Sequence, residues 1–165
     1  MRKLIALLIF LLLFSIPIRA IEKNIFPNLK LVSLNNKEVN LYSLIKDEKL
    51  IFINFFTSWC HYCQLEMPDL IKLANEYQSK NVLFLGIDYD EGLDIVKKLV
   101  NDSKINYPVY VVSNKELENK FVLDGFPTTI VINNKKRVMN KIVGYRDYNY
   151  FKEFISSPKQ KFFIH

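Results

Sequence analysis

Residues 50–68, LIFINFFTSWCHYCQLEMP, decide the fold of this chain, because an apolar run leads directly into two closely spaced cysteines. Every residue from 50 to 56 except Asn54 is apolar or aromatic, as is typical of a β-strand buried on both faces. From Cys60 to Tyr77 the apolar residues recur at helical spacing, which predicts a helix bent by Pro68. The inner face of that helix is predicted to comprise Leu65, Leu70, Leu73, Ala74 and Tyr77.

Strand and helix patterns alternate on both sides of this stretch. Residues 29–34 and 38–42 alternate apolar with polar positions around the turn 35–37, which predicts a β-hairpin. Further strands are predicted at 82–88, 108–112, 128–133 and 137–144, and further helices at 91–102, 115–123 and 147–156. This order predicts an α/β sandwich with a mixed sheet in one domain, residues 21–165.

The first 20 residues, MRKLIALLIFLLLFSIPIRA, predict an export signal that stands apart from the domain. A short basic start precedes an unbroken apolar stretch at 4–14, which is short for a membrane span of about 20 residues. Cleavage after Ala20 is expected. Ile18, however, is large for a position where small residues are preferred, so a retained membrane anchor is the alternative. Either way the domain is expected outside the cytosol, in the periplasm or another extracytoplasmic space.

The composition argues against disorder and against nucleic-acid binding. Half of the 165 residues are hydrophobic, which is ample for a sizeable core. The net charge is +6 at pH 7, but lysine and arginine are scattered among aspartate and glutamate and form no basic stripe. No nucleic-acid partner is therefore expected.

Cys60 and Cys63 are the only cysteines, and their position indicates chemistry rather than cross-linking. Disulfides persist outside the cytosol, but one that closes so short a loop adds little stability. A Cys-x-x-Cys that follows a strand and opens a helix is typical of a thioredoxin-like redox motif. At the helix N-terminus, unpaired N–H groups favour a thiolate on Cys60, and Cys63, one turn on, can resolve the mixed disulfide. A protonated His61 would favour the anion further; a solvated surface position is the other interpretation of this residue.

Metal and haem sites fit the cysteine pair less well. Attachment of a c-type haem needs a histidine directly after the second cysteine, where the chain has Gln64. Structural zinc needs four ligands, and beyond the two cysteines the chain offers only two histidines. Two thiolates do suit Cu(I), so a copper carrier stays open as an alternative function. No metal and no cofactor is expected for the redox function.

The sequence also resembles a known family, the exported thioredoxin-like proteins of the TlpA/ResA/CcmG type. The resemblance spans nearly all of residues 25–156 and includes NFFTSWCHYCQLEMP, GIDYDEG, YPVY, GFPTTIVIN and a closing glycine. The family pattern Trp-Cys-x-x-Cys-x-x-Glu-x-Pro is matched by Trp59, Cys60, Cys63, Glu66 and Pro68. The resemblance implies a thioredoxin-like α/β fold, with a central mixed β-sheet flanked by helices and an N-terminal β-hairpin. A peroxiredoxin-like Thr-x-x-Cys spacing is present as well, but Ile53 stands where those enzymes carry proline.

The resemblance implies roles for residues beyond the cysteine motif. In relatives the proline matching Pro127 is cis, faces the cysteines and keeps metals off the pair; a trans turn proline is the alternative. The backbone of the preceding residue, Phe126, is expected to pair with an extended substrate. The residues implied to contact substrate are Trp59, His61, Tyr62, Phe126 and Pro127.

Glu66 is the candidate for tuning the thiol pKa values. Ordinary thioredoxins carry a buried aspartate six residues before the first cysteine, whereas this chain has Asn54, which cannot accept a proton. Family members use a glutamate at the position of Glu66; an exposed helix carboxylate is the alternative. The pair His61-Tyr62 departs from the proline-containing dipeptides common in the family, so the sequence leaves the reduction potential open.

The leading hypothesis is an exported thiol–disulfide oxidoreductase that reduces disulfides in exported proteins. By resemblance, apocytochrome c is an expected substrate. A membrane-embedded thiol reductase is the expected electron donor, since the chain has no third cysteine. A monomer is expected. The alternatives are a thioredoxin-like copper carrier and, within the same chemistry, a disulfide oxidant or isomerase.

Overall fold

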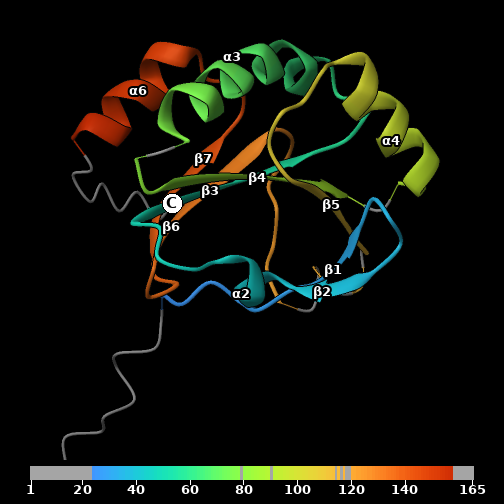
Figure 1. Ribbon diagram of the computed structural model, residues 1–165, viewed down its shortest axis with the longest axis horizontal. Helices are drawn as coiled ribbons and strands as arrows, with labels where there is room; N and C mark the ends of the chain where they lie inside the picture. The colour runs from blue at the N-terminus through green and yellow to red at the C-terminus, as the bar shows by residue number, and fades with distance from the viewer. Residues whose placement is uncertain are drawn as a thin grey trace, which may run out of the picture.

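Figure 1 shows the chain, as a computed structural model, with a central sheet and helices on both of its sides. The structure describes residues 24–78, 80–89, 91–113, 115, 117 and 120–157. The predicted export signal at 1–20 lies outside these residues. Among the residues described, no helix is long and apolar enough to cross a membrane.

The sheet, within the described part of the chain, has seven strands in the order β2-β1-β5-β4-β3-β6-β7. Their bounds are β1 Lys30–Ser33, β2 Glu38–Asn40, β3 Leu50–Phe56, β4 Val82–Tyr89, β5 Val109–Val112, β6 Thr128–Asn133 and β7 Val138–Val143. β3 is parallel to β4 and β4 is parallel to β5, whereas the other neighbours are antiparallel. The predicted mixed sheet is confirmed, and the predicted hairpin of β1 and β2 forms one of its edges.

The described residues form four helices: α2 Leu41–Leu44, α3 His61–Tyr77, α4 Leu93–Asp102 and α6 Tyr148–Ser156. In Figure 1, α3, α4 and α6 lie on one side of the sheet and α2 lies on the other. The predicted strand 38–42 is too long. It ends at Asn40, because the buried Leu41 begins α2 and its N–H donates to Leu29 O at 2.9 Å. The predicted helix 115–123 is too long: residues 115 and 117 are helical, whereas 120–123 are not, and the other residues of this stretch lie outside the described part of the chain.

β3 is buried along its whole length, as its apolar run predicts. Successive side chains of a strand point to opposite faces. Phe52 and Phe56 pack in the core beneath α3 and α6, whereas the odd-numbered residues of the strand pack in the core on the other face. Asn54 shares the face of Phe52 and Phe56. The polar side chain of Asn54 therefore lies on the face of the sheet that is covered by α3, the helix that carries the cysteines.

The inner face of α3 differs from the prediction at Leu65, which is 49% exposed. The buried positions of α3 are Cys63, Glu66, Met67, Leu70, Leu73 and Tyr77. A helix turns by about 100° per residue, so Leu65 lies about 200° from Met67 and faces solvent. Pro68 lies inside α3 with an exposed ring, and the bend predicted there stays a prediction.

Candidate active site

The turn between β3 and α3 brings both cysteines to the start of the helix. Cys60 is the N-cap residue of α3, and Cys63 lies in the first turn. The two residues form a disulfide with Cα atoms 5.3 Å apart, and Cys63 N–H donates to Cys60 Sγ at 3.1 Å. The first N–H groups of a helix lack intrahelical partners, so a thiolate on Cys60 would be stabilised by them and by the helix dipole. The predicted placement of Cys60 at the helix N-terminus is confirmed.

The two cysteines differ in accessibility. Cys60 is 7% exposed, whereas Cys63 is 1% exposed. Since a thiolate must reach the substrate disulfide in order to attack it, this difference favours Cys60 as the attacking residue. Cys63 is then placed to attack the sulfur of Cys60 from inside the protein.

The loop before β6 lies beside the cysteine turn. Thr128 pairs with Phe55 in the antiparallel β3–β6 register, so Pro127 lies next to the carboxyl end of β3, from which that turn departs. The Phe126–Pro127 peptide is cis, as the resemblance implies, and Pro127 is buried. Gly144 N–H donates to Pro127 O at 2.8 Å, which ties this loop to the residue after β7.

Exposed aromatic side chains flank the disulfide. Trp59 is 72% exposed and Tyr62 is 60% exposed. The Trp59 ring meets the Phe126 ring edge-on at 6.2 Å, and Phe126 also lies 5.3 Å from the Tyr89 ring. His61 is exposed too, with its ring 5.8 Å from that of Tyr62. Large exposed apolar side chains of this kind are typical of surfaces that bind another polypeptide; the substrate-contact roles of these residues stay predictions.

Glu66 is 1% exposed, so the alternative of an exposed helix carboxylate is wrong. Asn54 Nδ2 donates to Glu66 Oε2 at 2.8 Å, and Arg146 N–H donates to Glu66 Oε1 at 3.0 Å. Burial raises the pKa of Glu66 to about 7, because the hydrogen bonds from Arg146 and Asn54 offset it only in part. Glu66 lies three residues beyond Cys63 on the same buried face. A group that can hold a proton near neutral pH therefore stands close to the predicted resolving cysteine.

Sequence patterns did not predict the partners of Asn54 and Ser58. Asn54 Nδ2 donates to Thr129 Oγ1 at 2.9 Å as well as to the α3 carboxylate. The Glu91 carboxylate accepts from both Ser58 N–H and Ser58 Oγ–H, each at 2.5 Å. A signal for the second contact was present, because Ser58 and Glu91 follow two parallel strands whose carboxyl ends share one edge of the sheet.

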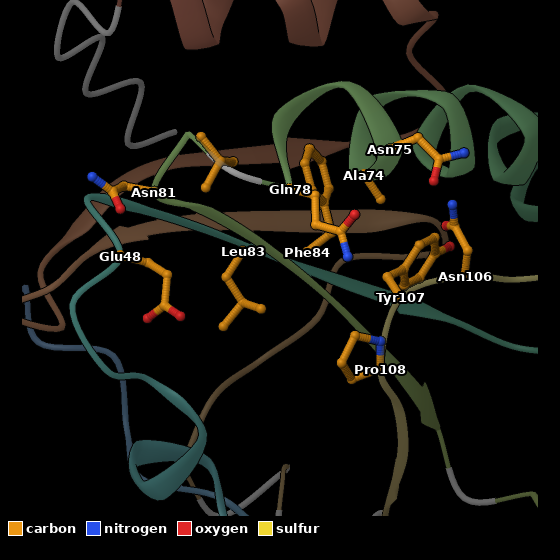
Figure 2. Close-up of a pocket in the computed structure, with 11 residues that line it drawn as sticks. Glu48, Ala74, Asn75, Gln78, Asn81, Leu83, Phe84, Asn106, Tyr107 and Pro108 are labelled. Carbon is orange, nitrogen blue, oxygen red and sulfur yellow. The ribbon is translucent and has the colours of Figure 1, made fainter.

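Elsewhere the described residues hold a cavity but no cluster of metal ligands. The cavity has a volume of about 450 Å³ and is shown in Figure 2. Apolar residues line it together with the amide side chains of Asn75, Gln78, Asn81 and Asn106. It lies at the amino end of β4, away from the cysteines, and burial raises the pKa of Tyr107 in its wall. Within the described ranges no three His, Cys, Asp or Glu side chains gather as a metal site needs.

Known proteins are similar to this chain in sequence and in fold. Residues 23–141 match the AhpC/TSA family. Thiol-disulfide oxidoreductase ResA of Bacillus thuringiensis (strain Al Hakam) is 30% identical over 118 residues, which are 72% of this chain and 67% of the relative. The crystal structure of a thioredoxin-family thiol:disulfide interchange protein from Chlorobium tepidum TLS matches with a TM-score of 0.69 at 29% identity, covering 81% of this chain and 94% of that one. StoA from Bacillus subtilis matches with a TM-score of 0.65 at 17% identity, over 78% and 96% of the two chains, and shows the shared fold alone. This chain belongs to the AhpC/TSA family and is a thioredoxin-like thiol–disulfide oxidoreductase of the ResA type.

Proposed function

We propose that this oxidoreductase is exported and reduces disulfides in other exported proteins. The observation that carries the proposal is the pairing of an accessible, helix-capping Cys60 with a buried Cys63. Exposed Trp59 beside the pair supports a polypeptide substrate, which can lie across the surface. The export signal predicted at 1–20 supports a location outside the cytosol.

The order of the two sulfur atoms defines the reaction. The Cys60 thiolate attacks one sulfur of a substrate disulfide, so a Cys60–substrate disulfide forms, the substrate S–S bond breaks, and the other substrate sulfur leaves as a thiolate that takes up a proton. The Cys63 thiolate then attacks Cys60 Sγ and releases the second substrate sulfur. Two electrons pass to the substrate, and the protein ends with the Cys60–Cys63 disulfide that the structure describes.

Glu66 is proposed to assist the resolving step. Only the thiolate of Cys63 attacks, so a base that removes its proton speeds this step. Burial raises the pKa of Glu66 to about 7, and the carboxyl group lies three residues from Cys63 on the same helix face. Such a carboxyl group can accept the proton and later return it near neutral pH, whereas the amide of Asn54 cannot.

The oxidised protein needs an outside electron donor, because the chain has no third cysteine. On the family resemblance, this donor is proposed to be a membrane-embedded thiol reductase. The proposed substrates include apocytochrome c with its haem-binding cysteines. A disulfide oxidant or isomerase is the competing assignment for the same two sulfur atoms.

Trapping of the mixed disulfide tests the proposal. A full-length Cys63→Ser variant, expressed in its host, should accumulate disulfide adducts through Cys60 that a reducing agent dissolves. Mass spectrometry of the adducts then identifies the substrates. Cys60→Ser is the matched control: it retains one thiol but should trap no substrate. A folded Cys63→Ser protein that forms no adduct would contradict the proposal.

The reduction potential separates a reductant from an oxidant. The full chain is equilibrated with dithiothreitol or glutathione buffers, and the alkylated thiols are counted. A value near about −270 mV, as in thioredoxin, supports a reductant, and one near about −120 mV refutes it. The measurement is sensitive enough, because about 30 mV already corresponds to about 1.4 kcal/mol.

A further inference from the structure

Ser58, the residue before Trp59, is held by side chains at its N–H, its hydroxyl group and its carbonyl oxygen. Ser58 N–H donates to Glu91 Oε2 and Ser58 Oγ–H donates to Glu91 Oε1, both at 2.5 Å. Ser58 O accepts from Gln64 Nε2 at 2.7 Å. Ser58 follows β3 and Glu91 follows β4, which are parallel neighbours. Both oxygens of one carboxylate thus bind a single residue of the turn that leads to the cysteines.

A second carboxyl group supports Glu91 from inside the protein. Asp88, near the end of β4, is fully buried, and its Oδ1 accepts from Glu91 N–H at 3.0 Å. The two side chains also hydrogen-bond to each other. Burial raises the pKa of Glu91, but the hydrogen bonds with Asp88 and Ser58 outweigh it and hold this pKa below its ordinary value, so Glu91 carries a negative charge at neutral pH.

We infer that Glu91 is a positioning residue for the dithiol: its carboxylate holds Ser58 and thereby the turn that ends at Cys60. The Trp59 side chain is 72% exposed, so the turn is not anchored by an indole buried in the core. Cys60 N–H donates to Thr57 O at 3.3 Å across the same turn, so a displacement of Ser58 also displaces the cysteine. This role applies to either direction of electron flow and does not depend on the proposed reducing function.

Replacing Glu91 by glutamine removes the charge but keeps the size and one acceptor oxygen. An anion bonded to Ser58, two residues before Cys60, disfavours a second anion on that cysteine, so the Cys60 thiol should become more acidic in Glu91→Gln. A more acidic thiol stabilises the dithiol form relative to the disulfide. The expected change in the dithiol–disulfide equilibrium constant is about threefold to tenfold in favour of the dithiol.

The test compares three variants of the full chain with the wild type: Glu91→Gln, Ser58→Ala and Asp94→Asn. Asp94 is the matched control, because its carboxylate is fully exposed on α4, three residues further along. The dithiol–disulfide equilibrium constant is measured in glutathione buffers, and the Cys60 thiol pKa is measured from the rate of alkylation against pH. Fluorescence anisotropy of the oxidised protein reports the rotational freedom of Trp59, the only tryptophan in the sequence.

The positioning role of Glu91 is supported by three results together. E91Q shifts the equilibrium constant as expected, E91Q and S58A both lower the Trp59 anisotropy, and D94N keeps the wild-type values. Wild-type equilibrium, thiol pKa and anisotropy in a folded E91Q protein overturn it. If E91Q does not fold, S58A decides, because it removes only one hydroxyl group; unchanged anisotropy in S58A then overturns the role. If E91Q shifts the dithiol–disulfide equilibrium constant but Cys63→Ser forms no adducts, the proposed reducing function is contradicted and the positioning role of Glu91 stands. The two proposals can therefore fail separately.

Discussion

Replacing Glu66 by glutamine should stabilise the protein above neutral pH. Burial raises the pKa of this carboxyl group to about 7 from an ordinary value of 4.5. Below about 4.5 the group is protonated in both the folded and the unfolded state, and it makes no difference to stability. Between the two values the folded state binds the proton more tightly, so the unfolding free energy falls as the pH rises. Above about 7 the group is ionised in both states, and the folded state carries the full cost of a buried charge.

The size of this effect follows from the two pKa values. Each pKa unit corresponds to about 1.36 kcal/mol, so the interval from 4.5 to about 7 amounts to about 3 kcal/mol. Glutamine fits the site, because its carbonyl oxygen can accept the Arg146 N–H that Glu66 Oε1 accepts now. Asn54 can turn its amide over, so that its oxygen accepts from the new amide and from the Thr129 hydroxyl group. The Glu66→Gln variant should therefore not show this loss of unfolding free energy as the pH rises.

Urea unfolding followed by circular dichroism measures the difference. Oxidised wild type and Glu66→Gln are compared from about pH 4 to about pH 8, so that titrations common to both proteins cancel. The gap between the two should open between about 4.5 and about 7. Glu153→Gln, at an exposed position of α6, is the control and should follow the wild type. Parallel profiles for wild type and Glu66→Gln would refute the reasoning.

Two further predictions concern the core. Phe52→Ala should cost about 3–5 kcal/mol of unfolding free energy, because the ring is fully buried and stacks on Phe84 at 4.9 Å; a loss below about 1 kcal/mol in urea unfolding contradicts this packing. Its control is Ile95→Ala at a 52% exposed position, which should change stability by less than about 0.5 kcal/mol. Gly86→Ala should cost about 1–3 kcal/mol by overpacking, because the added Cβ would lie 3.1 Å from a Phe56 ring atom; an unchanged thermal midpoint would show that the core adapts.

Local patterns in the sequence were sufficient to predict most helices and strands and the redox pair Cys60 and Cys63. The apolar run at 50–56 and the cysteine motif after it involve contiguous residues, and their periodicity does not depend on the rest of the fold. The same holds for the placement of Cys60 at the start of α3. Leu65 shows where such patterns fail. An apolar residue beside the apolar face of a helix gives the same sequence pattern whether its side chain is buried against the sheet or exposed to solvent.

Only the tertiary structure decided which distant side chains meet around the cysteines. β3 lies between β4 and β6, so Asn54 and Thr129, 75 residues apart in the chain, become hydrogen-bond partners. The same strand order brings Glu91 to Ser58. The burial of Glu66, and with it the raised pKa, results from several elements packing together around one carboxyl group. No local sequence pattern predicts this burial, because each helix or strand supplies only part of the surface that excludes water from Glu66.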